Sequence, residues 1–211
     1  MRNKENNIVF IIITLGNSGV GKSSIINRYV NQSFDEKSLS TIGLNFSFKE
    51  VTLKNKRKIQ LKLIDTGGQE KYRAISKSYF RNSDVVLFVF SLNDEKSYND
   101  MTEWIQLFKE NHNGKEGIQN YLIGNKSDLE RKVDQNIIAE FAKNNNLYYI
   151  ETSAKENISI DELFEDIAEK LYEDYVKSGR ENKAQNNIRI AKQKKRSKKC
   201  CLFTPDDMDI N

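Results

Sequence analysis

The stretch "ITLGNSGVGKSSIINRY" (13–29) follows an apolar run and carries the spacing G-x-x-x-x-G-K-S from Gly16 to Ser23. Between a strand and a helix, this spacing predicts a phosphate-binding loop, the P-loop, rather than a mere connection. Its glycines let the backbone wrap closely, so that N–H groups ahead of the helix point at phosphate oxygens. Lys22 is expected to reach the β- and γ-phosphates of a nucleotide, and the Ser23 hydroxyl to bind Mg²⁺. The predicted phosphate contacts are Ser18, Gly19, Val20, Gly21, Lys22, Ser23 and Ser24.

The composition of the 211-residue chain is that of one soluble domain with a charged surface, since 37% of its residues are hydrophobic and 30% are charged. A single histidine argues against histidine-based catalysis, and the basic residues crowd into a tail rather than a basic domain. The apolar run 8–15 is shorter than the ~18 residues of a membrane span and lacks a signal-peptide cleavage site. We therefore expect a cytoplasmic protein with a buried first strand and no nucleic acid among its partners.

Apolar runs alternate with helical patterns along most of the chain. Strands are predicted at 8–15, 44–53, 58–65, 84–92, 118–125 and 146–152, and helices at 21–30, 96–110, 136–145 and 159–176. A four-residue polar connection joins the second and third strands, so this pair is expected to be antiparallel. The pattern predicts an α/β fold with a six-stranded, mostly parallel sheet and helices on both faces. Ligands of such sheets bind beyond the carboxyl ends of the strands.

Apolar periodicity fades after residue 176, which predicts the boundary of the folded domain. The expected organisation is a short extension over residues 1–7, one domain over 8–176, and a flexible polybasic tail over 177–211. Cys200 and Cys201 are adjacent in this tail, so they cannot cross-link the fold and are too few for a structural zinc site.

Two further motifs follow predicted strands. The first is "LIDTGGQE" (63–70), in which Asp65 is expected to bind Mg²⁺ through a water molecule. The backbone N–H of Gly68 is expected to face a γ-phosphate, and Gln69 to orient an attacking water. By itself the D-x-x-G spacing is equally typical of a turn with a capping aspartate. Behind a P-loop, it indicates hydrolysis of a nucleoside triphosphate.

The base of the nucleotide is predicted from "NKSD" (125–128), which follows the fifth strand. A carboxylate at Asp128 accepts from two N–H groups on one edge of guanine but finds a single amine on adenine, so this residue favours GTP. Lys126 is expected to lie along the base, although Asn125 to Asp128 alone also suits an Asx-type turn. The backbone of Ser153, Ala154 and Lys155, after the sixth strand, is expected to complete recognition of guanine O6.

In this order and spacing, the motifs resemble those of the Ras superfamily of small GTPases over residues 8 to about 176. "STIGLNF" (40–46), "KYRAISKSYFRNSD" (71–84) and a Cys-Cys pair after a basic tail are most similar to the Rab family. The resemblance implies a Ras-like G domain of the P-loop NTPase class. It also implies that Thr41 binds Mg²⁺ and contacts the γ-phosphate, and that Phe34 packs on guanine.

The same resemblance implies a monomeric, Mg²⁺-dependent switch that binds GTP and GDP, hydrolyses GTP slowly and recruits effectors in vesicle traffic. Residues 33–46 and 66–81 would be the two switch segments, which meet an exchange factor, a GTPase-activating protein and effectors. A lipidated basic tail would hold the protein reversibly on the cytosolic face of an intracellular membrane. The alternatives are a GTP-binding interaction module with negligible hydrolysis and a P-loop ATPase or kinase.

The chain departs from the Rab-like pattern at several places. Ile64 and Gly67 stand where Rab-like sequences usually have Trp and Ala, and Asn45 stands where Asp is usual. Ile64 is expected to remove part of an effector surface, and Gly67 to loosen the backbone beside the γ-phosphate by about 0.5–1 kcal/mol. Ten residues follow Cys201, whereas Rab-like cysteines lie at the terminus. Prenylation of Cys200 and Cys201 is therefore one of several interpretations of this tail. The others are palmitoylation of one cysteine, proteolytic trimming of the extension, and a basic run that serves only as a nuclear-localisation-like signal.

Overall fold

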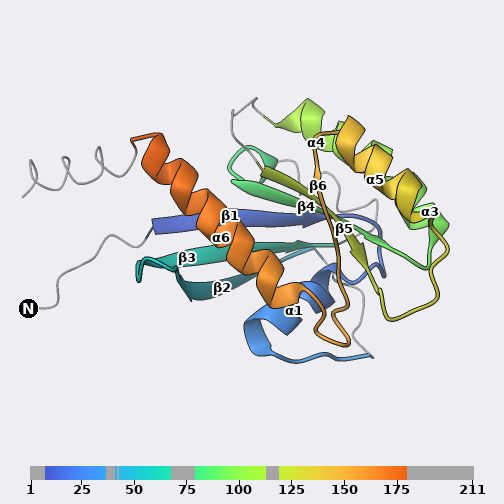
Figure 1. The fold of residues 1–211 in the computed structure, drawn as a ribbon, viewed down its shortest axis with the longest axis horizontal. Helices are drawn as coiled ribbons and strands as arrows, with labels where there is room; N and C mark the ends of the chain where they lie inside the picture. Colours follow the sequence, from blue (N-terminus) through green and yellow to red (C-terminus); the bar gives the residue numbers. More distant parts are fainter. Residues whose placement is uncertain (1–7, 37–40, 42, 68–78, 113–118, 180–211) are drawn as a thin grey trace, which may run out of the picture. The chain divides into compact units, whose positions relative to one another are not determined.

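A six-stranded sheet with the strand order β2-β3-β1-β4-β5-β6 organises the described part of the chain (Figure 1). The computed structural model describes residues 8–36, 41, 43–67, 79–112 and 119–179. The strands are β1 (Ile8–Leu15), β2 (Leu44–Thr52), β3 (Lys58–Thr66), β4 (Val85–Ser91), β5 (Gln119–Asn125) and β6 (Tyr148–Glu151). The helices are α1 (Lys22–Asn31), α3 (Glu95–Asn99), α4 (Met101–Asn111), α5 (Gln135–Asn144) and α6 (Ile160–Lys177).

The pairing of the strands confirms the predicted α/β fold. β2 pairs antiparallel with β3, and every other pair in the sheet is parallel. Parallel strands point their carboxyl ends the same way, so the segments that follow β1, β3, β5 and β6 gather at one edge of the sheet. The P-loop and the motifs at 125–128 and 153–155 therefore meet at that edge.

The chain divides into two compact units, Met1–Leu171 and Tyr172–Asn211. The first holds the sheet, and the second holds the last turns of α6 and two further described residues. The predicted tail and both cysteines, Cys200 and Cys201, lie outside the described residues, so the boundary near 176 stays a prediction. Within the described ranges, no helix combines the length and the apolar character that crossing a membrane requires.

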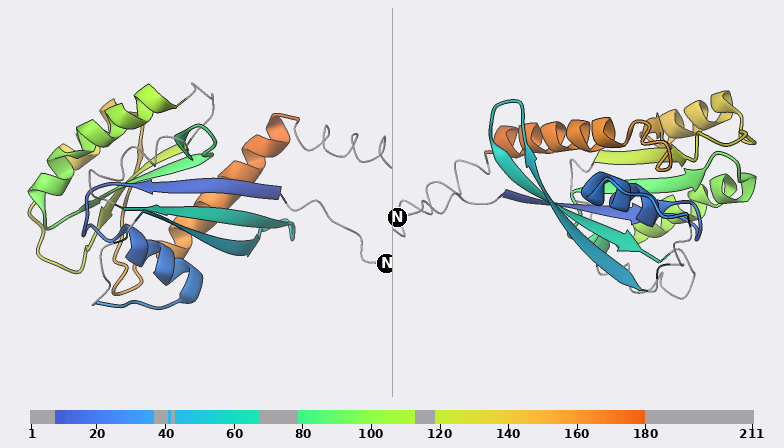
Figure 2. Two further views of the ribbon diagram at one scale, coloured as in Figure 1. Left: turned by 180° about the vertical axis from the view of Figure 1, so that it is seen from behind. Right: turned by 90° about the horizontal axis from the view of Figure 1, so that it is seen from below.

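One face of the sheet packs against α4 and α5. Apolar side chains of β1, β3, β4 and β5 form a core there with Trp104 and Phe108 of α4 and Ile138 of α5, all of them at most 4% exposed. The ring of Phe108 meets Phe80 and Phe88 edge-on, at centroid distances of 5.6 and 5.9 Å. The view from behind brings α4 forward of the strands (Figure 2).

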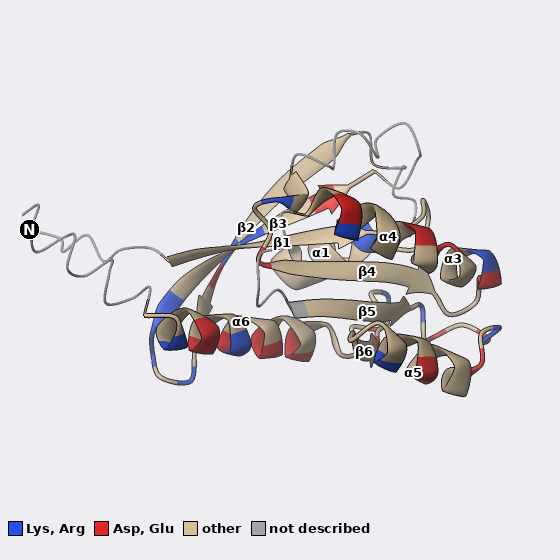
Figure 3. Ribbon diagram, turned by 90° about the horizontal axis from the view of Figure 1, so that it is seen from above, with Lys and Arg blue, Asp and Glu red and all other residues tan. Residues whose placement is uncertain are grey.

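The opposite face of the sheet packs against α1 and α6; in Figure 1, α6 crosses in front of the strands and α1 lies below them. Tyr29 of α1 stacks on Phe164 of α6 with ring centroids 4.0 Å apart, so the two helices contact each other as well as the sheet. Burial raises the pKa of the Tyr29 phenol far above its usual value of 10.0, with Asp161 and Glu165 adding to the shift. β4 and β5 carry no charged residue and are therefore uniformly tan in Figure 3. This is expected for strands that are covered by helices on both faces of the sheet.

The helix predicted over 96–110 is interrupted, and two helices, α3 and α4, meet at Asp100. Asp94 caps α3 by accepting from the backbone N–H of Lys96, whereas Asp100 makes no side-chain cap for α4. The Asp100 carboxylate instead accepts from Nδ2 of Asn17 at 2.7 Å. The Asp100 carboxylate, which could have capped α4, thus binds a residue 83 positions away in the sequence. The helical periodicity of the sequence does not indicate this contact.

Ile64 lies in the core rather than on the surface, since only 1% of the residue is exposed. Ile64 therefore contributes almost nothing to the surface, in agreement with the expected loss of part of an effector surface, and the effect on partner binding stays a prediction. The exposed aromatic group beside it is Phe46 of β2, which is 43% exposed and lies 5.6 Å from the ring of Tyr79. Nζ of Lys62 lies 4.8 Å from the centre of the Phe46 ring. The surface at this place thus depends on Phe46 and Tyr79.

Gly16 directly follows β1 and lies against the backbone of β4. Its φ is +146°, and a Cβ atom at this position would lie 2.0 Å from the carbonyl oxygen of Val89. Backbone of a central strand cannot give way to such a contact without disturbing the sheet. Glycine is therefore required at residue 16 by the fold itself, in addition to any ligand.

We predict that Gly16→Ala lowers the free energy of unfolding by about 3 kcal/mol or more, because overpacking adds to an unfavourable φ. Gly19→Ala is the matched control, since its φ is +78° but no atom lies within 4 Å of the added Cβ. The control should lose only about 1–2 kcal/mol. Urea denaturation of both variants measures the difference, and equal losses would contradict the close approach to Val89.

Candidate nucleotide-binding site

A pocket of about 320 Å³ opens at the edge of the sheet where the motifs meet. It is lined by Ser18, Gly19, Gly21, Lys22, Ser23, Ser24, Phe34, Asp35, Glu36, Thr41, Thr66, Asn125, Lys126, Asp128, Leu129, Ala154 and Lys155. One pocket therefore joins the P-loop, Thr41 and the two motifs predicted to hold a base. Among the other predicted site residues, Val20, Asp65 and Ser153 are buried, and Gly68 and Gln69 lie outside the described residues.

The side chain of Lys22 lies across the inside of the P-loop. It is 5% exposed, and its Nζ donates to the carbonyl oxygens of Gly16 at 2.9 Å and Asn17 at 2.7 Å. Burial lowers the pKa of the Lys22 ammonium from 10.5 to about 8, and the nearby Asp65 carboxylate opposes this shift. A phosphate group beside Lys22 would offset the cost of holding a buried positive charge.

Three oxygen-bearing side chains gather next to Lys22. The hydroxyls of Ser23 and Thr41 lie 2.6 Å apart, and Thr41 Oγ1 donates to Asp65 Oδ2 at 3.3 Å. Asp65 is 5% exposed, and its burial raises the pKa of the carboxyl group. The hydrogen bond from Ser23, the charge of Lys22 and the hydrogen bond from Thr41 each lower this pKa and offset part of the rise. Its second oxygen, Oδ1, is buried and has no hydrogen-bond partner among the described residues. A buried carboxylate oxygen beside two hydroxyls fits the all-oxygen coordination of Mg²⁺.

Within the described ranges, no three His, Cys, Asp or Glu side chains gather closely enough to hold a metal ion by themselves. The residues at hand for Mg²⁺ are therefore Ser23, Thr41 and Asp65, with the remaining oxygens left to phosphate and water, as is usual for this ion.

Asn125 connects the two ends of the pocket. Its Nδ2 donates to the carbonyl oxygen of Val20 at 2.8 Å, and its Oδ1 accepts from Thr152 Oγ1 at 3.1 Å and from the backbone N–H of Ala154 at 3.3 Å. A Cβ atom on Gly21, whose φ is +98°, would come within 2.2 Å of the same amide. Asn125 thus ties the P-loop to the segment that follows β6, a positioning role that sequence alone did not assign.

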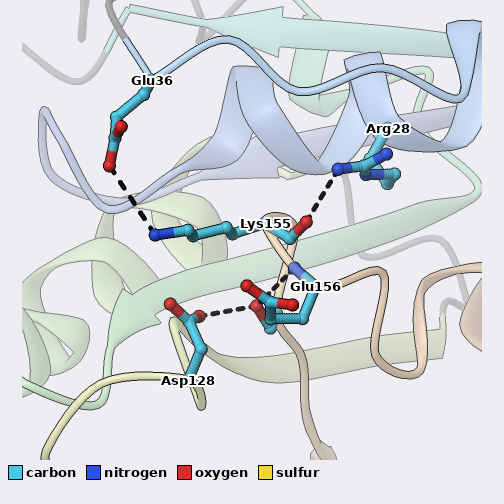
Figure 4. Close-up of polar contacts among 6 residues, drawn as sticks. Arg28, Glu36, Asp128, Lys155 and Glu156 are labelled. Carbon is cyan, nitrogen blue, oxygen red and sulfur yellow. Dashed lines mark hydrogen bonds and ion pairs between the residues drawn. The ribbon is translucent and has the colours of Figure 1, made fainter.

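At the far end of the pocket, Asp128 is oriented by Ser153. Ser153 Oγ donates to Asp128 Oδ1 at 2.5 Å and accepts from the backbone N–H of Glu156 at 3.0 Å (Figure 4). Ser153 is fully buried, so the hydroxyl serves as a fixed support for the carboxylate. Lys126 adopts a left-handed backbone conformation with φ 63° and lines the pocket beside Asp128. The predicted base-recognition residues are therefore brought together.

The structure places several residues at the site that the motifs did not indicate. Thr66 and Leu129 line the pocket directly after Asp65 and Asp128, so their position next to a motif was a usable signal. Asp35 and Glu36 follow Phe34 in the same way, and the Glu36 carboxylate lies 3.8 Å from the Lys155 ammonium (Figure 4). Asn17 lies within the P-loop motif, but its partners are distant in the sequence, and Arg28 carried no such signal.

Asn17 supports the P-loop from the side of α4. Its Nδ2 donates to Asp100, and its Oδ1 accepts from Trp104 Nε1 at 2.8 Å. Both ends of the amide are therefore held, one by Trp104 of α4 and the other by Asp100, the residue that precedes this helix. Since the Asn17 carbonyl accepts from Lys22, the backbone that surrounds the phosphate position is braced from outside the loop.

Comparisons with known proteins agree with this geometry. A sequence model of the Ras family matches residues 11–173. Ras-related protein Rab-13 of Rattus norvegicus is 34% identical over 198 residues, which cover 92% of this chain and 96% of the rat protein. Ras-related protein Rab-30 of Homo sapiens is 33% identical over 190 residues, covering 89% and 90% of the two chains. GTP-binding protein ypt1 of Schizosaccharomyces pombe is 33% identical over 173 residues, covering 81% and 84%.

The lowered pKa of Lys22 makes a prediction about pH. In the nucleotide-free protein Lys22 loses its proton above about pH 8, whereas in the unfolded chain it keeps the proton until about 10.5. The unfolded state therefore binds more protons in this interval, and the contribution of Lys22 to stability rises with pH between 8 and 10. We expect wild-type protein to gain stability relative to Lys22→Met over this interval, as measured by urea denaturation. Parallel pH profiles of the two proteins would contradict the assigned burial of the charge.

Proposed function

Because this chain belongs to the Ras family of small GTPases, we propose that it is a Rab-like, Mg²⁺-dependent switch that acts in vesicle traffic. As a member of this family, it is a GTPase that converts GTP to GDP. The observation that carries the proposal is one pocket whose lining combines Lys22 and Ser23 of the P-loop with Asp128. A nucleotide that spans the pocket would place its phosphates at the P-loop and its base at Asp128.

The phosphates are bound by the P-loop, with Lys22 turning from the loop carbonyls toward the β- and γ-phosphates. Bound Mg²⁺ would neutralise phosphate charge, held by Ser23, Thr41 and, through water, Asp65. Asp128, oriented by Ser153, accepts from the two N–H groups on the Watson–Crick edge of guanine. Lys126 and Phe34 line the same pocket and flank the base.

Hydrolysis proceeds by in-line attack of water on the γ-phosphate, and most of the catalysis is positioning and charge stabilisation. Gln69 orients the water, Gly68 offers its backbone N–H to the γ-phosphate, and Lys22 stabilises the developing charge. We expect an activating protein to supply an arginine that stabilises the charge of the transition state. The intrinsic reaction is accordingly slow.

The two switch segments are joined where they reach the pocket. The backbone N–H of Gly67 donates to the carbonyl oxygen of Gly43 at 2.9 Å, and Thr41 contacts both Ser23 and Asp65. Release of the γ-phosphate removes the charge that orders Thr41 and Gly68, so segments 33–46 and 66–81 change together. Exchange factors, activating proteins and effectors read this difference.

Membrane attachment is proposed through the tail, where Cys200 and Cys201 follow a basic run. One lipid chain binds a membrane reversibly, and basic residues near an anionic surface add ~1 kcal/mol each. The protein would then act as a monomer on the cytosolic face of an intracellular membrane. Mass spectrometry of the C-terminal peptide from native cells tests whether either cysteine carries a lipid.

The assignment of Gln69 predicts a selective loss of hydrolysis. Gln69→Leu should slow single-turnover GTP hydrolysis by about tenfold or more, because the attacking water is no longer oriented. GTP affinity should stay unchanged, which separates this effect from loss of the site. Hydrolysis at the wild-type rate in the variant would contradict the role of Gln69. Negligible hydrolysis by the wild-type protein, with and without cell extract, would favour the alternative of a GTP-binding interaction module.

The assignment of Asp128 predicts a change of base. Asp128→Asn should weaken GDP binding by about 100-fold, since a charged acceptor of two hydrogen bonds is lost. The amide donates as well as accepts, so xanthosine diphosphate, which has a carbonyl in place of the guanine amine, should bind the variant better than GDP does. Competition among GDP, xanthosine diphosphate and ADP measures both effects. Wild-type protein that prefers ADP would overturn the proposal in favour of a P-loop ATPase or kinase.

A further inference from the structure

We propose that Arg28 of α1 is a positioning residue for guanine recognition, acting through the main chain of the loop that follows β6. The inference rests on the proposed function, in which the backbone of residues 153–155 contacts guanine O6. Arg28 belongs to none of the motifs that indicate nucleotide binding, and it does not line the pocket. Its influence on the base must therefore pass through the groups that it holds.

The Arg28 guanidinium joins two segments that are more than a hundred residues apart. Its Nε donates to the carbonyl oxygen of Ala154 at 2.8 Å, and its Nη2 donates to the carbonyl oxygen of Lys155, also at 2.8 Å. Figure 4 shows the second of these bonds reaching from α1 to Lys155. Hydrogen bonds from a charged donor are stronger than neutral ones, and a planar fork fixes the orientation of both acceptors.

The two carbonyls belong to the segment whose other contacts set the base end of the pocket. The backbone N–H of Ala154 points to Asn125, and Ser153 supports Asp128. Within the described residues, Arg28 holds the same short segment from the side of α1. The segment is thus clamped between β5 and the helix that begins at the P-loop, so the base position is fixed relative to the phosphate position.

The same guanidinium reaches the start of the first switch segment. Nη1 of Arg28 donates to the carbonyl oxygen of Gln32 at 3.3 Å, and its Cζ lies 6.0 Å from the centre of the Phe34 ring. Phe34 lines the pocket and is the residue proposed to pack on guanine. The Arg28 side chain therefore contacts both the loop proposed to bind the edge of the base and the Phe34 ring proposed to pack on its face.

The neighbouring ion pair cannot perform this role as well. Lys155 and Glu36 are 3.8 Å apart, and their side chains are 48% and 80% exposed, so solvent screens the interaction. This contact also leaves the backbone of residues 154–155 free to shift, since it involves only the end of the Lys155 side chain. The two main-chain hydrogen bonds of Arg28 are the stronger restraint.

The test measures nucleotide release and base preference in the full-length protein. We expect Arg28→Met to release GDP about tenfold faster than wild type, because two charge-assisted hydrogen bonds are lost. Arg28→Lys should show an intermediate rate, since one ammonium cannot hold both carbonyls in the same geometry. Asn31→Met is the matched control on the same helix, at an exposed position, and should release GDP at the wild-type rate.

Base analogues separate positioning from general destabilisation. Sulfur is a weaker acceptor than oxygen, so the preference for GDP over 6-thio-GDP reports the contact to O6. We expect this preference to fall in Arg28→Met, while the preference for GDP over IDP, which reports the guanine amine at Asp128, stays as in wild type. Release of GDP at the wild-type rate would overturn the proposal. So would a fall in thermal stability with both preferences unchanged, because that result describes a purely structural residue.

The proposed function and this inference fail in different ways. If residues 125–128 and 153–155 do not hold guanine, Asp128→Asn will not gain xanthosine diphosphate binding, whatever Arg28 does. If the base site is correct but Arg28 does not position it, Asp128→Asn will change base preference and Arg28→Met will leave release and preference as in wild type.

Discussion

The arrangement of the nucleotide site depends on the buried amide of Asn125. This side chain is 1% exposed and has hydrogen-bond partners on the P-loop, at the end of β6 and in the loop that follows. An amide supplies both donors and acceptors from one group, which a carboxylate or an ammonium does not. The P-loop and the segment that follows β6 are therefore held at a fixed separation, which suits a ligand bound at both places.

Two buried charged groups, Lys22 and Asp65, lie close together beside the P-loop, and their burial favours the binding of a charged ligand. Burial lowers the pKa of Lys22 and raises that of Asp65, so each ionised group is costly to hold in the interior. The two charges offset each other only in part. A phosphate beside Lys22 and a divalent cation beside Asp65 would compensate both, which explains why binding of nucleotide and Mg²⁺ is expected to be coupled at this site.

Supports from outside the pocket hold the residues that touch the ligand. Asn17 is held by Trp104 of α4 and by Asp100, which precedes that helix, and Arg28 of α1 holds the loop after β6. Both faces of the sheet thus contribute to one site at its edge. Asn17 and Arg28 fix the positions of the loops that line the pocket, and neither residue belongs to the pocket lining. The short motifs therefore need the surrounding domain to hold them in place.

The sequence by itself determined the class of the fold, the P-loop and which carboxylate is proposed to read the base, because these depend on local spacing and on the chemistry of single side chains. Strand periodicity and the G-x-x-x-x-G-K-S spacing placed Lys22 and Ser23 correctly in the pocket, and "NKSD" placed Asp128 there. Only the tertiary structure decided that Ile64 is buried, that the helix predicted over 96–110 breaks at Asp100, and that Arg28 and Asn125 link distant loops. Each of these outcomes depends on partners far away in the chain, and no local pattern of residue types encodes such a partner.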